Sequence, residues 1–249
     1  MREGKLGELI FVEGLRLCEE ALSSGLAIEA VIYSNQIAEK ERARDFLNAV
    51  ATTAARLVSV SEKLLATISY TKTPQGIVLL ALRPSSEQEL LVRRAESAML
   101  VVMHNINNPV NVGAILRTAE AAGATGAITT AQTCDPFSAK ALRGAMGSAF
   151  RLPLWSGPTY DEVISWCEQR SIATICADAG GDTNYIELDW TQPCALIFGP
   201  ESKGFSAEEL QAASQTVAIP MQGNVESLNV AVTAGVLLYE AMRQRHRRV

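Results

Sequence analysis

Short apolar runs alternate with segments of helical periodicity along most of this 249-residue chain. Continuous apolar runs bounded by polar or turn residues are typical of buried strands. We expect such strands at 30–33, 57–60, 77–82, 98–103, 127–130, 172–177, 194–198 and 215–219. Helical patterns are expected at 12–22, 40–51, 61 onward, 112–122, 138 onward, 160–170 and 227 onward. This alternation predicts an α/β protein with a mostly parallel sheet and helices on both faces.

A polar break at 83–89, which contains Pro84 and two serines, divides the chain. We therefore expect a small α/β domain at 1–84, a linker at 85–95 and a parallel-sheet domain at 96–249. About eighty residues suffice for a small independent domain, although a marginal one.

Composition narrows the class of protein. The sequence is 48% apolar and 20% charged and has no run of eighteen apolar residues, so we expect a globular protein without a membrane span. Its start lacks the basic and then apolar pattern of a secretory signal. Five scattered cysteines, never spaced as Cys-x-x-Cys, predict reduced thiols in a cytoplasmic protein and no metal site. Only His104 and His246 could supply histidine chemistry.

The net charge of −5 counts against a generic nucleic-acid binder but allows a local basic patch. One basic cluster lies at the end of the chain: Arg243, Arg245, Arg247 and Arg248. We interpret it as a solvated helix end whose cations complement the helix dipole.

Three expected strand ends are unusually polar: 111–118, 199–204 and 219–229. Ligands of parallel sheets bind beyond the carboxyl ends of strands, where the chain turns into helices. Neither the Gly-x-Gly-x-x-Gly pattern of dinucleotide sites nor a P-loop is present, which counts against a dehydrogenase.

Each polar residue also has a structural interpretation. Asn111 and Ser227 could cap helices, Arg117 could form a surface ion pair, and Glu201 could pair with Lys203 or cap a helix that begins near Ser206. Three such loops at neighbouring strand ends are nevertheless more consistent with a site for a polar ligand.

The same loops resemble the three motifs of the SpoU/TrmH family of RNA ribose 2′-O-methyltransferases, in the SPOUT superfamily. The matching segments, in the family's order and spacing, are Asn111-x-Gly-x-x-x-Arg117-Thr, Gly199-x-Glu201-x-x-Gly204 and Ile219-Pro-Met-x-Gly-x-x-x-Ser227-Leu-Asn229. Residues 1–84, with Phe11-Val-Glu-Gly14 and Thr73-Pro-Gln-Gly-Ile-Val78, resemble an L30e-type RNA-binding domain.

This resemblance implies an α/β methyltransferase domain whose C-terminal segment forms a deep trefoil knot. It implies that S-adenosylmethionine binds at Gly199, Gly204, Ile219, Met221 and Leu228. Glycines allow close approach of the backbone, and an apolar slot suits an adenine.

The resemblance also places Arg117, Asn111, Glu201, Ser227 and Asn229 in the catalytic set. Arg117 is expected to be essential, either in deprotonating the ribose hydroxyl or in stabilising the developing alkoxide, and the other four to orient it, the ribose or the methionine tail. A guanidinium is a poor base.

Family members are homodimers, and Ala231-x-x-x-Gly235 would let a partner helix approach closely. The expected substrate is ribosomal RNA of the large subunit in preference to tRNA. A tRNA methyltransferase and an inactive RNA-binding relative remain the alternatives.

Overall fold

The structure, a computed structural model, describes residues 8–71, 73–200 and 203–246. By its internal contacts the chain divides into two compact units. The first is Met1–Pro84 with Phe137–Arg151, and the second is Ser85–Pro136 with Leu152–Val249. None of the described helices is both long enough and apolar enough to cross a membrane.

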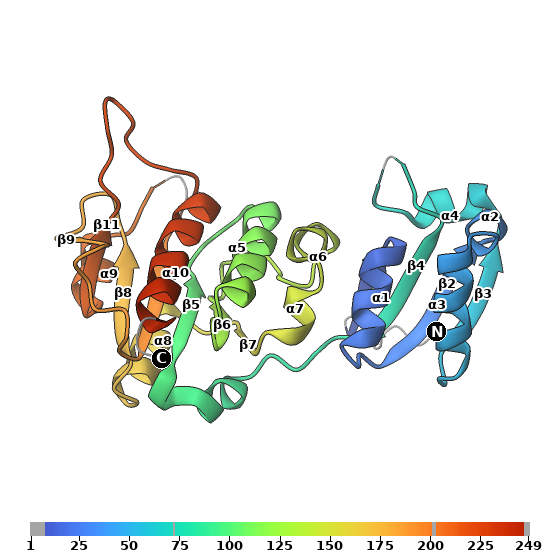
Figure 1. The fold of residues 1–249 in the computed structure, drawn as a ribbon, viewed down its shortest axis with the longest axis horizontal. Helices are drawn as coiled ribbons and strands as arrows, with labels where there is room; N and C mark the ends of the chain where they lie inside the picture. Colours follow the sequence, from blue (N-terminus) through green and yellow to red (C-terminus); the bar gives the residue numbers. More distant parts are fainter. Residues whose placement is uncertain (1–7, 72, 201–202, 247–249) are drawn as a thin grey trace. The chain divides into compact units, whose positions relative to one another are not determined.

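The first unit contains a four-stranded sheet with the order β1-β4-β2-β3, of which β4, β2 and β3 are labelled in Figure 1. β2 and β3 are parallel, whereas β4 is antiparallel to both of its neighbours. The strands are β1 (Leu9–Glu13), β2 (Ile28–Ser34), β3 (Arg56–Val60) and β4 (Ile77–Leu82). The helices are α1 (Leu15–Ser23), α2 (Asn35–Ala38), α3 (Glu41–Ala51), α4 (Glu62–Ile68), α6 (Ala139–Ala145) and α7 (Ser148–Arg151).

One expected helix of this unit is partly wrong. Residues 12–22 do not form a single helix, because β1 continues to Glu13 and α1 begins only at Leu15. Gly14 separates the two elements with a φ of 100°, a conformation that a side chain would strain. A Cβ there would also lie 2.7 Å from the amide end of the Gln75 side chain, which is flexible and could move aside, so it is the backbone conformation that requires Gly14.

The second unit is built on a seven-stranded sheet with the order β7-β6-β5-β10-β8-β11-β9. Every neighbouring pair is parallel, which confirms the predicted parallel sheet. The strands are β5 (Met99–Met103), β6 (Gly126–Thr129), β7 (Leu154–Ser156), β8 (Ala173–Ala177), β9 (Thr183–Asn184), β10 (Cys194–Phe198) and β11 (Gln215–Ala218). The helices are η2 (Gln88–Ser97), α5 (Pro109–Ala121), α8 (Tyr160–Glu168), α9 (Ala207–Ala212) and α10 (Val230–His246).

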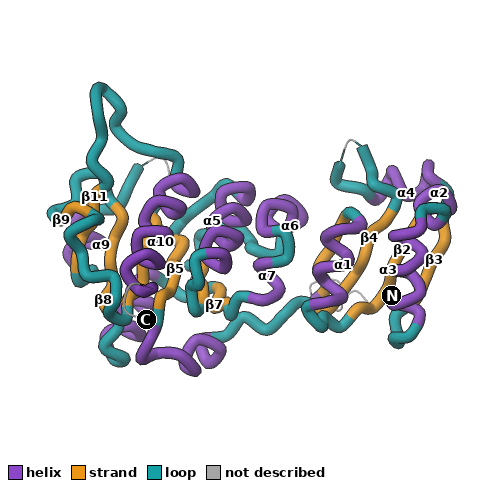
Figure 2. Tube along the Cα trace, in the orientation of Figure 1, coloured by secondary structure: helices purple, strands orange, loops and turns teal. Residues whose placement is uncertain are grey.

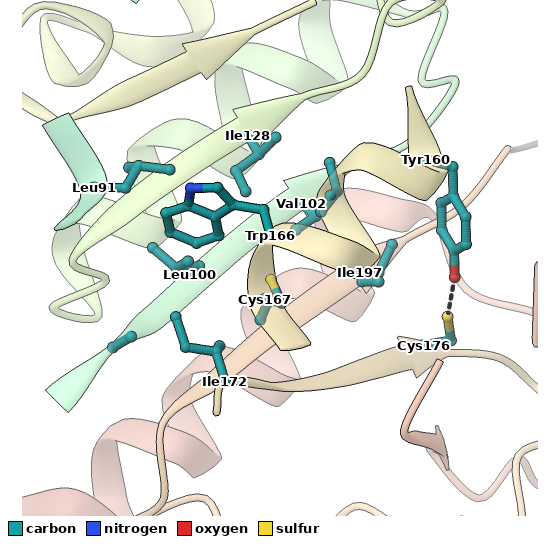
Figure 3. Close-up of a cluster of buried hydrophobic side chains, with 13 residues drawn as sticks. Leu91, Leu100, Val102, Ile128, Tyr160, Trp166, Cys167, Ile172, Cys176 and Ile197 are labelled. Atoms are coloured by element: carbon teal, nitrogen blue, oxygen red, sulfur yellow. Dashed lines mark hydrogen bonds between the residues drawn. The ribbon is translucent and has the colours of Figure 1, made fainter. Parts of the chain in front are cut away.

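The core of this unit lies on the two central strands, β5 and β10, whose residues are all buried. Trp166 of α8 packs between Leu91 and Leu100, and the Tyr160 hydroxyl lies 3.3 Å from Cys176 Sγ on β8 (Figure 3). Continuous apolar strands are therefore covered by helices, as expected for a parallel sheet.

The strand order shows that the chain does not add strands in sequence. β10 lies between β5 and β8, and β11 lies on the other side of β8. A long loop, residues 219–229, then joins β11 to α10 (Figure 2), and α10 packs against α5. A knotted passage of this last segment stays a prediction.

Candidate active site

The first polar segment, 111–118, is not a loop but lies within α5, because this helix begins earlier than expected. Asn108 caps α5, since its side chain accepts a hydrogen bond from the Val110 N–H at 3.0 Å, and Pro109 is the first helical residue. Asn111 is therefore not a cap. It lies within the first turn of α5 and is only 7% exposed.

Arg117 lies further along α5 and is exposed. Its guanidinium makes no hydrogen bond or ion pair with any residue in the described part of the chain, so the expected structural ion pair is not seen there. Asn111 and Arg117 are separated by six positions, which places them on different faces of the helix. The buried amide and the exposed cation therefore have different surroundings.

The second polar loop follows β10. Gly199 lies under the ring of Phe205, and a Cβ at this position would be 2.7 Å from the ring carbons, so the ring would have to move. Gly204 has a φ of 65°, and its N–H donates to the carbonyl of Pro200 at 3.1 Å. Glu201 lies outside the described residues. Ser206 caps α9, through a capping box with Glu209.

The third polar loop leads into α10, which begins at Val230 and not near Ser227. Asn229 occupies the capping position. Its Oδ1 accepts hydrogen bonds from the N–H of Ala231 at 2.9 Å and from that of Val232 at 3.4 Å. Ser227 is therefore not the cap expected from the sequence, and lies exposed in the preceding loop.

The second and third loops form one cavity of about 590 Å³. It is lined by all five residues expected to bind a cofactor: Gly199, Gly204, Ile219, Met221 and Leu228. Ser227 and Asn229 also line it, whereas Asn111 and Arg117 do not. The first polar segment is joined to the cavity through Asn229, whose Nδ2 donates to Asn111 Oδ1 at 3.4 Å.

Asp178 and Phe205 are among the lining residues that were missed from the sequence. Asp178 directly follows β8, so the rule that drew attention to the other strand ends could also have found it. Its Oδ1 accepts a hydrogen bond from the Gly180 N–H at 2.9 Å. No sequence pattern identifies Phe205 as a lining residue, because its place in the cavity wall depends on how closely its ring approaches Gly199 in the folded protein.

The buried thiols near this region are not suited to nucleophilic chemistry. Burial raises the pKa of Cys176 to about 11 and that of Cys167 to about 12. Both stay protonated at neutral pH, and a neutral thiol is a weak nucleophile. The described residues also contain no group of three or more side chains that could hold a metal ion. The arrangement favours binding and alignment of a small molecule.

Comparison with known proteins agrees with this geometry. Residues 98–239 match the SpoU rRNA Methylase family, and residues 3–79 match the MRM3-like substrate binding domain. A 23S rRNA (uridine(2479)-2′-O)-methyltransferase of Streptomyces viridochromogenes is 31% identical over 246 residues, which are 97% of this chain and 84% of that protein.

Solved structures are similar over both units. The SpoU methyltransferase AviRb from Streptomyces viridochromogenes, in complex with the cofactor AdoMet, has a TM-score of 0.89 at 30% identity, covering 99% of this chain and 94% of that one. An AdoMet-bound rRNA methyltransferase from Sinorhizobium meliloti has a TM-score of 0.84 at 28% identity, covering 98% and 90%. Fold and cavity are those of a cofactor-binding α/β enzyme. The chain belongs to the SpoU rRNA methylase family.

Proposed function

We propose that this protein transfers the methyl group of S-adenosylmethionine to the 2′-hydroxyl of a ribose in ribosomal RNA of the large subunit. The main observation behind this proposal is that the second and third polar loops line one cavity. Asn229, which lines this cavity, also forms a hydrogen bond with the buried Asn111. The similarity to a 23S rRNA 2′-O-methyltransferase over 97% of the chain favours this substrate.

The cavity fits S-adenosylmethionine in size and in the character of its wall. Pockets for small molecules typically span about 300–1,000 Å³, and this one is within that range. Gly199 and Gly204 allow the backbone to approach a bound molecule, and Ile219, Met221 and Leu228 give an apolar surface for a base. When bound, the cofactor supplies a methyl group that its positive sulfur already activates, so the protein has mainly to align the hydroxyl and assist loss of its proton.

Arg117 is proposed to stabilise the negative charge that develops on the ribose oxygen and to hold a neighbouring phosphate. Its guanidinium has a pKa above about 12, so it is a poor base, but its planar donors suit an oxyanion or a phosphate. Its exposure leaves it accessible to RNA. Asn111, Glu201, Ser227 and Asn229 are proposed to orient Arg117, the ribose or the methionine part of the cofactor.

We infer that residues 1–84 form a domain that binds the RNA substrate and that residues 96–249 form the domain that transfers the methyl group. Residues 85–95 are then the linker between the two domains. Tyr70 of the first part is 72% exposed, which leaves its ring accessible to an unpaired base. Its backbone N–H donates to Glu13 Oε2 at 3.0 Å, and its ring packs edge-on against Phe11 with centroids 4.9 Å apart. A firmly held and exposed aromatic ring supports recognition of a structured RNA with splayed bases.

The protein is proposed to act as a homodimer in the cytoplasm, a reducing compartment in which thiols such as Cys167 stay reduced. Val232 and Tyr239 on α10 are 52% and 48% exposed, and a Cβ added at Gly235 between them would meet nothing within 4 Å. An apolar helix face with a small residue at its centre suits close packing of a second helix. Analytical ultracentrifugation of the wild-type protein should give twice the mass of one chain. The Tyr239→Asp variant should sediment with the mass of a single chain.

Labelled S-adenosylmethionine incubated with RNA fractions tests the function. Incorporation into large-subunit rRNA supports it, and incorporation into tRNA alone would favour the tRNA alternative. Cofactor binding without incorporation into any RNA would favour an inactive RNA-binding relative.

A further inference from the structure

His104 is a buried side chain that lies next to the cofactor cavity but does not line it. It directly follows β5, is 5% exposed, and donates its backbone N–H to the carbonyl of Phe198, the last residue of β10, at 2.8 Å. The backbone of His104 is therefore held in place by the ends of β5 and β10. Its imidazole is thus placed at the edge of the sheet from which the second polar loop departs.

The ring of His104 connects β5 to α9. Its Nε2 lies 2.7 Å from Glu209 Oε1 and 3.1 Å from Asn105 Nδ2, and its Nδ1 lies 3.2 Å from the hydroxyl of Thr130. An ionised carboxylate only accepts hydrogen bonds, so Nε2 carries a proton and donates it to Glu209. The Thr130 hydroxyl can serve the other ring nitrogen. The imidazole is held at both ends.

Glu209 uses its two oxygens for two different tasks. Oε2 accepts a hydrogen bond from the Ser206 N–H at 2.7 Å and completes the capping box of α9, while Oε1 faces His104. Burial opposes ionisation of this carboxyl, but the hydrogen bonds from Ser206 and the contact with His104 outweigh it and lower its pKa. One carboxylate thus forms the start of α9 and attaches it to the end of β5.

The attachment extends to the cavity wall through Phe205, which directly precedes the cap. Its ring is nearly parallel to that of His104, at 6° with centroids 6.3 Å apart, and it covers Gly199 so closely that an added Cβ there would lie 2.7 Å from the ring carbons. Phe205, Gly199 and Gly204 all line the cavity. Displacement of Phe205 would therefore change the shape of the cavity, although His104 and Glu209 are not part of its lining.

We propose that His104 is a positioning residue for cofactor binding: through Glu209 it anchors α9 and holds Phe205 against Gly199, which keeps the cavity open to S-adenosylmethionine. This inference rests on the proposed function. The role falls to two residues that do not line the cavity.

Three variants separate the hydrogen bond from the packing of the ring. His104→Phe keeps an aromatic ring beside Phe205 but removes the donor to Glu209, and His104→Ala removes both. His104→Gln supplies an amide N–H at about the position of Nε2 and should restore the contact. The control is Glu162→Ala, which removes the equivalent carboxylate from the capping box of α8 and does not line the cavity.

Isothermal titration of each purified protein with S-adenosylhomocysteine tests the proposal. We expect Kd to rise at least tenfold for His104→Phe and His104→Ala, to stay within about threefold of wild type for His104→Gln, and to stay unchanged for Glu162→Ala. In the pair His104→Phe with Glu209→Ala, the double variant should bind no more weakly than the weaker single variant, since both remove the same link.

If the wild-type protein binds no S-adenosylhomocysteine, the proposed function is contradicted, because the protein would not bind its methyl donor. If wild type binds it and His104→Phe binds equally well, the positioning role is wrong while the proposed function stands. Should His104→Ala be poorly folded, hydrogen exchange of Gly204 and Ser206 in His104→Phe decides, because this variant keeps the capping box of α9: faster exchange than in wild type supports the link, and unchanged exchange contradicts it.

Discussion

Asn229 and Asn111, 118 positions apart in the sequence, meet through their side chains, with Asn229 Nδ2 donating to Asn111 Oδ1 at 3.4 Å. The other end of the Asn229 amide caps α10. A single side chain therefore begins the last helix and joins the third polar loop to the first polar segment. This double use links the cofactor cavity to the helix that carries Arg117.

The two uses of Asn229 can be separated by substitution. Asn229→Ser keeps a capping oxygen but cannot reach Asn111, so unfolding in urea should give a stability close to wild type, with methyl transfer strongly reduced. Asn229→Ala should also lose the helix cap, which should lower the free energy of unfolding by about 1 kcal/mol. If Asn229→Ser transferred methyl groups at the wild-type rate, the link to Asn111 would be without catalytic importance.

Arg117 is predicted to act on the reacting oxygen and not on the cofactor. Arg117→Ala should lower the rate of methyl transfer at least a hundredfold and leave the Kd for S-adenosylhomocysteine unchanged, because Arg117 does not line the cavity. Arg117→Lys should recover little, since an ammonium lacks the planar pair of donors. Substantial turnover by Arg117→Ala would remove Arg117 from the catalytic set.

Arg245 corrects the interpretation of the terminal basic cluster as a solvated helix end. Its guanidinium donates to four backbone carbonyls from two separate segments: Ser97 and Ala98 in one, Trp190 and Gln192 in the other. It therefore fastens the end of α10 to the start of β5 and to the segment before β10. Arg245→Ala should lower the free energy of unfolding by about 3 kcal/mol, since it leaves these carbonyls without their charged donor.

Arg243→Ala is the matched control for Arg245. Arg243 pairs with Glu240 within the same helix and is exposed, so its removal should change the urea midpoint little. Equal midpoints for the two variants would contradict the role given to Arg245.

The buried thiols predict a loss of stability at alkaline pH. Burial raises the pKa of Cys18, Cys167, Cys176 and Cys194 above the ordinary value of about 9. As pH rises past 9, these thiols ionise in the unfolded chain but not in the folded one, so each lowers stability by up to about 1.4 kcal/mol per pH unit. For Cys167 this loss continues to about pH 12, its folded pKa.

Urea unfolding between about pH 8 and pH 10 measures this loss of stability. Cys167→Ala should show a shallower decline than wild type, because one of the contributing thiols is gone. Parallel declines in the two proteins would mean that Cys167 ionises equally in both states.

The sequence predicted the parallel sheet because strands such as Met99–Met103 are continuous apolar runs, whose pattern needs no tertiary information. It did not predict β9, since Thr183–Asn184 is too short to show a pattern. The start of α10 was misplaced because Ser227 and Asn229 are both good capping residues, and only the path of the loop decides between them. Such choices depend on tertiary structure.

The candidate site shows the same limit. Its motif residues could be found from spacing, but the role of His104 beside it could not, nor could that of Arg245 at the end of α10. Glu209 lies 105 positions from His104, and the carbonyls that Arg245 binds belong to segments up to 148 positions away. Side chains that join distant segments leave no periodic signal in a single sequence.

The central claim, ribose 2′-O-methylation of large-subunit rRNA, is tested most directly by mapping the product. Unmodified 23S rRNA from a strain that lacks this protein should be incubated with the enzyme and S-adenosylmethionine, and then hydrolysed by alkali. We predict one new alkali-resistant linkage, at a single nucleotide, that Arg117→Ala does not produce. A methyl group found on a base, or no modification of 23S rRNA at all, would contradict the account.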